Sequence, residues 1–186
     1  MKNIAVIAGG DSGEYKISIN SATVVAQNID AKKNHIYLVE IKGSDWFHQH
    51  PSLGRIDIDK NDFSLTIENE TIRFDKIFNA IHGTPGEDGK ILGYFEMLGI
   101  PFTSSSAIAS GLTFNKSYCN QVVKNAGVLV ANSVHLFKGE SFHIEEILNK
   151  ISLPCFVKPN QGGSSVGMSK VKEVQELQAA IEKAFA

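Results

Sequence analysis

Hydrophobic and polar positions along this chain follow two different periods. Short apolar runs at residues 2–9 and 35–41 are ended by glycine or charged residues, as buried parallel strands are. Between these runs, Ile17, Val24 and Val25 recur at helical spacing, which predicts a helix. An order of strand, helix and strand is typical of an α/β fold with a parallel sheet.

The pattern continues through the first hundred residues. Residues 44–74 contain alternating stretches split by polar turns, which indicate hairpins at the edge of the fold. Residues 74–83 are expected to form another buried strand, and the helix after it carries Ile91, Phe95 and Leu98 on one face. This part of the chain therefore predicts a Rossmann-like parallel-sheet domain.

A serine cluster at residues 104–106 separates this series from a second one, and we expect domains of 1–112 and 113–186. The elements expected in the second domain are a helix at 115–126, a strand at 128–137, a short helix at 142–150, strands at 155–159 and 166–172, and a closing helix with Val174, Leu177, Ile181 and Phe185 on one side.

Composition narrows the class of protein. The 186 residues are 42% hydrophobic and 20% charged, with a formal net charge of −2 and no basic run, which argues against a nucleic-acid or membrane partner. The apolar start is too short for a signal peptide, so a cytoplasmic location is expected. Cys119 and Cys155 lack CxxC spacing and are expected to be reduced packing residues.

Residues 162–169, GGSSVGMS, nearly match a Walker phosphate loop. Met168 stands where that motif requires lysine, and a strand pattern follows where it requires a helix. Two strands joined by a glycine and serine loop predict a flap whose N–H groups and hydroxyls close over polyphosphate oxygens. Lys158 can supply the cation, at roughly 4 kcal/mol per charge contact before desolvation. The alternative is a flexible turn beside a surface lysine.

The stretch GGDSGE, residues 9–14, lies where the first strand meets the first helix. Its glycines allow a ligand to approach the backbone, but the dinucleotide spacing GxGxxG is absent. The carboxylate of Glu14 would stand where a pyrophosphate must lie, so an amine-bearing ligand is predicted. Two alternatives remain: a dinucleotide site with Glu40 on the ribose, or an acidic residue that only decorates the first helical turn.

The stretch HGTPGEDG, residues 82–89, follows another strand. Three glycines and a proline form a tight loop that can present His82, Glu87 and Asp88 together, at the strand end where open α/β sheets bind ligands. Of the six histidines only His82 has such a setting. A loop histidine can also be a simple turn residue, but three such loops together indicate a ligand site.

The stretches GGDSGEYKIS, HGTPGEDGKILGYFEMLGIPFTSSS, FNKSYCNQVV and CFVKPNQGGSSVGMSKV, in this order, closely resemble the D-alanine–D-alanine ligases, bacterial cell-wall enzymes of the ATP-grasp superfamily. The resemblance spans essentially the whole chain. It implies a pre-ATP-grasp, D-alanine-binding domain at 1–112 and the first part of an ATP-grasp domain at 113–186.

The reaction implied by the resemblance is peptidoglycan precursor synthesis. ATP phosphorylates the carboxylate of one D-alanine, the amine of a second D-alanine attacks the acyl phosphate, and phosphate leaves. By resemblance, Glu14 holds the first substrate's ammonium group, His82 lies beside its carboxylate, and Ser164 helps to orient it.

The resemblance also implies an ATP site. Lys116 and Lys158 match the two lysines on the ATP phosphates, while Gly163, Ser164 and Ser165 belong to the flap. Asn115 precedes Lys116 where aspartate is common in the family, which bears on how that lysine is oriented.

The metal and adenine sites are expected elsewhere. Mg²⁺ and adenine ligands are expected beyond Ala186, with no metal ligand in this chain, so the 186 residues alone are expected to be inactive. A homodimer through the amino-terminal domain is also expected.

Other functions stay open at this point. Relatives of this kind also make D-Ala–D-Lac or D-Ala–D-Ser. A nicotinamide-dependent dehydrogenase would use GGDSG and Glu40, and a non-catalytic binding module would need no turnover.

Overall fold

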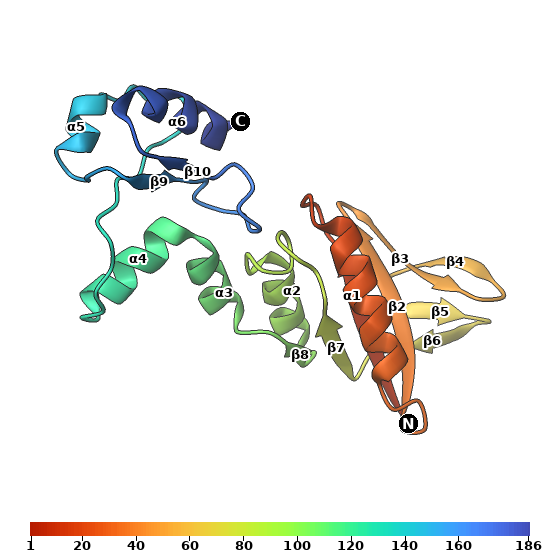
Figure 1. The fold of residues 1–186 in the computed structure, drawn as a ribbon. Coiled ribbons are helices and arrows are strands. Elements are labelled where there is room, and N and C mark those ends of the chain that lie inside the picture. Colours follow the sequence, from red (N-terminus) through yellow and green to blue (C-terminus); the bar gives the residue numbers. More distant parts are fainter. The chain divides into compact units, whose positions relative to one another are not determined.

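A computed structural model describes residues 1–186, which divide into two compact units, Met1–Gly111 and Leu112–Ala186 (Figure 1). The elements that begin in the first unit are β1 (Lys2–Gly9), α1 (Tyr15–Asn28), β2 (Asn34–Lys42), β3 (Asp45–His50), β4 (Gly54–Asp57), β5 (Leu65–Ile67), β6 (Glu70–Ile72), β7 (Lys76–Asn79), α2 (Lys90–Leu98), β8 (Phe102–Thr103) and α3 (Ala107–Phe114). The serine cluster at 104–106 lies inside this unit, before α3.

A six-stranded sheet in the order β4-β3-β2-β1-β7-β8 forms the centre of the first unit. Strand β1 pairs in parallel with β2 and β7, and β7 pairs in parallel with β8. Strands β3 and β4, at one side of the sheet, form an antiparallel hairpin, as the alternating sequence predicts. The predicted α/β fold with a mostly parallel sheet is therefore confirmed, and the carboxyl ends of β1 and β7 lie side by side.

Alternate residues of the sheet enter two separate cores. Ile7 and Ile77 pack with Phe63 and Phe95 in the larger cluster on one face. On the other face, residues that include Val6, Ala8 and Ala80 pack against Ala22 of α1, which lies along β1 and β2 in Figure 1. Both faces are covered, which explains why β1 is a continuous apolar run.

Helix α1 buries only part of the apolar set that predicted it. Ile17 and Val24 are 53% and 60% exposed, while Ser18 and Ala22 are fully buried. Small side chains on the buried face let the helix approach the sheet closely, and a hydroxyl can be buried where it is hydrogen-bonded. Of the three residues that predicted the helix, only Val25 packs against this core, so hydrophobicity alone did not identify the small residues of the contact.

The second unit is smaller. Its elements are α4 (Lys116–Asn125), α5 (Ile144–Leu148), β9 (Cys155–Val157), β10 (Ser169–Val171), the 3-10 turn η1 (Val174–Glu176) and α6 (Leu177–Phe185). Strands β9 and β10 form an antiparallel hairpin around the glycine and serine stretch, as predicted. Leu177 and Ile181 of α6 pack with Val171 and Ile147 in a single core.

The strand predicted at 128–137 is wrong, because this segment forms no regular structure. Leu129 is 99% exposed, and Val128 and Phe137 are each 55% exposed, while Val134 and Leu136 reach the core of the unit. A strand needs a neighbouring strand for its backbone hydrogen bonds, and an apolar run alone does not provide one.

Other predicted strands are shorter than expected. Strands β7, β9 and β10 correspond to the strands predicted at 74–83, 155–159 and 166–172. They are four, three and three residues long. Residues 80–83 and 158–168 lie instead in the loops after β7 and β9, which carry the candidate functional groups.

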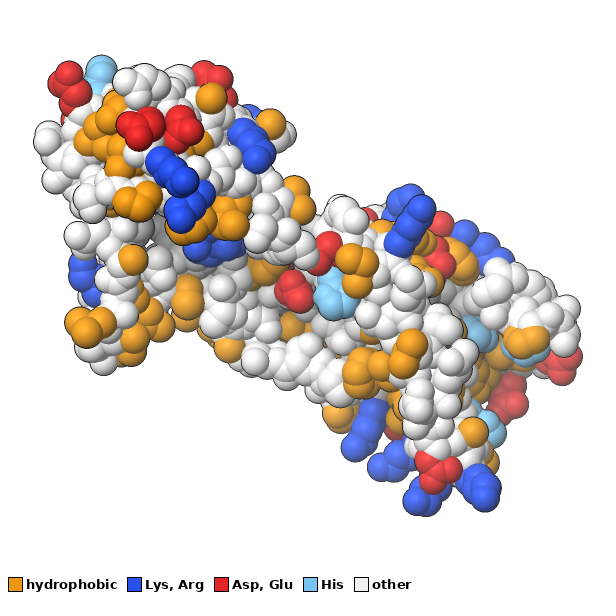
Figure 2. Space-filling model, viewed as in Figure 1, with side chains coloured by type: hydrophobic (Ala, Val, Ile, Leu, Met, Phe, Trp, Pro, Cys, Tyr) orange, Lys and Arg blue, Asp and Glu red, His pale blue; other side chains and the backbone are white.

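The surface and the cysteines agree with the composition. On the face shown in Figure 2, basic side chains lie in several separate places among acidic ones. Cys119 and Cys155 are free thiols. No helix is both long enough and apolar enough to span a bilayer.

Candidate functional site

The two loops predicted to bind a ligand lie against each other in the first unit. The Asp11 backbone N–H donates to the Thr84 carbonyl at 2.9 Å. The Ser12 hydroxyl donates to the His82 carbonyl at 2.8 Å. The GGDSGE and HGTPGEDG stretches, seventy residues apart in sequence, therefore meet at the carboxyl edge of the parallel sheet.

Glu14 lies beside the turn that carries His82. A Cβ atom added to Gly83 would lie 4.0 Å from Glu14 Oε2 and 2.8 Å from Ser12 Cβ. Gly83 also has a φ of +74°, which favours glycine. The backbone approach that brings the Glu14 carboxylate to this turn therefore leaves no room for a side chain at Gly83.

His82 faces the same helix that Glu14 begins. Its Nε2 atom lies 3.4 Å from the hydroxyl of Ser21, which is in the second turn of α1. A carboxylate and an imidazole at neighbouring positions can hold the two charged ends of a small zwitterion, since each can form a charge-assisted hydrogen bond. The structure therefore brings together two of the three predicted catalytic residues, Glu14 and His82.

Ser18 anchors this helix to both strands, and the sequence patterns gave no sign of it. Its buried hydroxyl accepts from the Gly9 N–H at 2.8 Å and donates to the Ala80 carbonyl at 2.8 Å. Its own N–H donates to the Glu14 carbonyl at 3.0 Å. Ser18 thus links the ends of β1 and β7 to the residue that carries the candidate amine ligand.

Glu87 and Asp88 brace the HGTPGEDG loop from within. Glu87 accepts from the Gly83 N–H at 3.0 Å. Asp88 is ion-paired with Lys90 at 2.7 Å and is only 8% exposed. Burial raises the pKa of Asp88, but hydrogen bonds from Lys90 and Thr84 outweigh it, so the net pKa lies below the usual value. These carboxylates hold the shape of the loop that presents His82.

Glu40, the ribose ligand of the dehydrogenase alternative, is engaged with Tyr15. The Tyr15 hydroxyl donates to Glu40 Oε1. This hydrogen bond, with burial and the Glu40 charge, raises the pKa of Tyr15 to about 12. The Lys42 ammonium group lies 5.4 Å from the Tyr15 ring centroid. Glu40 therefore takes part in a local polar cluster.

The two predicted phosphate lysines come together in the second unit. Lys116 is the first residue of α4, and Lys158 follows β9 directly. Lys116 Nζ donates to the carbonyls of Gly162 at 2.8 Å and Asn160 at 3.4 Å. Burial lowers the pKa of Lys116, and the nearby Lys158 charge lowers it further. A pair of close ammonium groups is suited to a polyphosphate.

The tip of the hairpin, which includes Gly163, Ser164 and Ser165, is exposed. Ser164 and Ser165 have φ values of 49° and 59°, a left-handed conformation that costs a non-glycine residue about 1–2 kcal/mol. Such strain is found at functional loops. At the base of the tip, a Cβ added to Gly167 would lie 2.8 Å from Pro159 Cγ, so glycine lets the hairpin close. The joint site of Ser164 with Glu14 and His82 stays a prediction.

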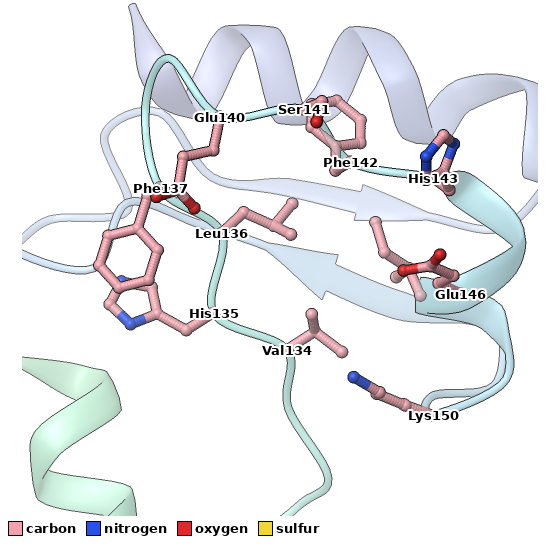
Figure 3. A pocket seen from close by; sticks show the side chains of 11 residues that line it. Val134, His135, Leu136, Phe137, Glu140, Ser141, Phe142, His143, Glu146 and Lys150 are labelled. Carbon is pink, nitrogen blue, oxygen red and sulfur yellow. The ribbon is translucent and has the colours of Figure 1, made fainter.

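A separate pocket of about 210 Å³ lies in the second unit, between residues 134–143 and α5 (Figure 3). The rings of His135 and Phe137 lie 4.5 Å apart at one end. Its ionisable lining is mixed, with Glu140 and Glu146 as well as Lys150. It contains none of the predicted site residues.

The fold and these loops define an α/β protein of the ATP-grasp kind, and comparisons with known proteins identify the family. A family model described as D-ala D-ala ligase N-terminus matches residues 3–105, and one described as D-ala D-ala ligase C-terminus matches residues 122–186. The chain belongs to the D-alanine–D-alanine ligase family.

Individual relatives agree. The chain is 50% identical over 184 residues to the D-alanine–D-alanine ligase of Parabacteroides distasonis, covering 99% of this chain and 56% of the relative. The VanG D-Ala:D-Ser ligase of Enterococcus faecalis superposes with a TM-score of 0.85 at 34% identity, covering 99% of this chain and 59% of that one. A D-alanine–D-alanine ligase of Bacillus anthracis solved with ATP gives 0.75 at 27% identity, covering 100% and 56%.

Proposed function

We propose that this chain provides the first D-alanine site and the phosphate-binding lysines of an ATP-dependent ligase that joins two D-alanines for peptidoglycan synthesis. The observation that carries the proposal is the Glu14 carboxylate beside the His82–Gly83 turn. Support for ATP comes from the Lys116 and Lys158 pair, and from the Bacillus anthracis relative, which was solved with ATP.

In this proposal the chain's own residues bind and orient. Glu14 pairs with the ammonium group of D-alanine, and His82 lies at its carboxylate, which is the nucleophile toward the γ-phosphorus of ATP. Lys116 and Lys158 neutralise the phosphate oxygens, and the hairpin tip with Ser164 covers them. An anchored nucleophile and a neutralised phosphate are what in-line phosphoryl transfer requires.

Mg²⁺ is proposed as the second cofactor because ATP-dependent ligases use it with the nucleotide. The chain has no group of three or more His, Cys, Asp or Glu side chains that could hold a metal ion.

D-alanine is also proposed as the second substrate. The relative at 50% identity is named for D-alanine, whereas the D-Ala:D-Ser ligase is 34% identical. The higher identity favours D-alanine. The dehydrogenase alternative is without support. Glu40 accepts a hydrogen bond from Tyr15, and the family model that matches is that of a ligase.

A cytoplasmic location and a homodimer through the first unit complete the proposal. The dimer is supported by Ile17 and Val24, which are exposed apolar residues of α1 in that unit.

Calorimetric titration of the chain with D-alanine tests the amine site. We expect binding of D-alanine in preference to L-alanine, and a loss of about tenfold or more in Glu14→Gln, because a charge-assisted hydrogen bond is worth about 1.5–3 kcal/mol. Glu70→Gln, an exposed residue on β6, is the matched control. Equal binding by the wild type and Glu14→Gln would overturn the proposed site.

A further inference from the structure

The first turn of α4 is capped by two asparagines from distant parts of the chain. The Lys116 N–H donates to the Asn160 carbonyl at 3.1 Å. The Ser117 N–H donates to Asn160 Oδ1 at 2.8 Å, and the Tyr118 N–H donates to Asn115 Oδ1 at 3.0 Å. The first three N–H groups of the helix, which have no partner inside it, are therefore all satisfied.

The two asparagine side chains also bond to each other. Asn160 Nδ2 donates to Asn115 Oδ1 at 2.9 Å, and Asn115 is buried, with 8% of its surface exposed. We call the side chains of Asn115 and Asn160 the amide clamp. The clamp joins the start of α4 to the segment that follows β9.

Each of the two phosphate lysines lies close in sequence to one asparagine of the amide clamp. Lys116 follows Asn115 directly, and Lys158 lies two residues before Asn160. The two ammonium groups repel each other, and this repulsion adds to the burial that lowers the pKa of Lys116. Like charges move apart unless the backbone that carries them is held. The clamp supplies that restraint.

Because the N–H groups of Lys116, Ser117 and Tyr118 are used by the clamp, the N-terminus of α4 does not offer them to an anion. Recognition of phosphate in this unit then depends on side-chain ammonium groups and on the hairpin tip. The positions of Lys116 and Lys158 are correspondingly important.

We propose that Asn115 and Asn160 are positioning residues that hold Lys116 and Lys158 at the spacing needed to bind the phosphates of a nucleotide. This inference rests on the proposed function. Asn115 Oδ1 acts only as an acceptor in the clamp, so aspartate at this position keeps both hydrogen bonds.

Titration of the chain with ATP is the first test. Asn160→Ala and Asn115→Ala should each weaken ATP binding by about tenfold, which corresponds to about 1.4 kcal/mol. Asn115→Asp should stay within about threefold of the wild type, since one carboxylate oxygen can replace the amide oxygen. Asn120→Ala, on the same helix, is the control and should bind as the wild type does.

The second test needs no nucleotide. The pKa of the Lys116 ammonium group can be measured by NMR in the isotope-labelled chain. It should move toward the ordinary lysine value in Asn160→Ala and should stay unchanged in Asn120→Ala. An unchanged Lys116 titration in Asn160→Ala, in a variant with wild-type circular dichroism, would contradict the clamp. If the wild type fails to bind ATP, the proposed function fails, while the lysine titration still decides about the clamp.

Discussion

Individual small residues decide how closely the ligand loops of the first unit approach each other. Gly83 packs against the Ser12 side chain beside the Glu14 carboxylate, and Gly10 approaches the Thr84 carbonyl in the same way. Residues with a Cβ atom at these positions would push the loops apart. The geometry of the candidate D-alanine site therefore depends on glycines as much as on the charged residues.

Gly83→Ala should disrupt this packing. The substitution places a Cβ 2.8 Å from Ser12 Cβ at a φ of +74°, and we expect a loss of about 2 kcal/mol or more in the free energy of unfolding. Gly13→Ala, in the same loop system, meets nothing within 4 Å and should cost little. Urea unfolding of both variants measures the difference, and equal stability would contradict the close approach of the loops.

Tyr15 should make the free energy of unfolding depend on pH in the alkaline range. Its pKa is about 12 in the folded chain against an ordinary value of 10.0, so the neutral phenol is favoured by folding. The contribution is complete below pH 10 and is lost as the pH rises through 12. Tyr15→Phe should reduce the fall in unfolding free energy between these values. An identical pH profile in Tyr15→Phe would show that the bond to Glu40 does not have this effect.

At the scale of elements, apolar periodicity predicted those strands and helices whose apolar residues meet a partner. The run at 2–9 became β1 because β2 and β7 flank it. The run at 128–137 is also rich in apolar residues but has no neighbouring strand, so it stays irregular. Partners distant in sequence leave no local signal, and such elements could not be judged from the chain alone.

In the candidate site, too, residues with a local sequence pattern were predicted, and residues that depend on distant partners were not. Glu14, His82 and Lys158 were predicted as site residues because strand-end loops of glycine and ionisable residues have a recognisable pattern. Ser18 and Asn160 were missed. Their bonds to Ala80 and Asn115 span 62 and 45 residues, and serine or asparagine in isolation indicates nothing more than a polar position.

The Ser18 hydroxyl should contribute to the stability with which helix α1 is held on the sheet. Ser18→Ala leaves the Gly9 N–H and the Ala80 carbonyl buried without a partner, which should lower the unfolding free energy by about 1–3 kcal/mol. Thr23→Ala, which removes a hydroxyl bonded only to Ile19 of the same helix, is the control and should cost less. Thermal or urea unfolding distinguishes them, and a neutral Ser18→Ala would show that the helix is held by apolar packing alone.

Across the whole molecule, the two units divide the proposed work. The first unit contains the Glu14 and His82 loops, and the second contains the lysine pair with the hairpin. Each of the two family models matches residues of one unit only. The chain spans about 56% of its Parabacteroides relative, so turnover of the complete enzyme remains part of the proposal.

The most direct test of the central claim is an NMR titration of the isotope-labelled chain with D-alanine and then with ATP and Mg²⁺. We predict that D-alanine shifts the amide signals of residues 12–14 and 82–83, while L-alanine does not, and that ATP shifts those of Lys116 and 162–166. D-alanine shifts located elsewhere, or equal shifts with both alanine enantiomers, would contradict the account.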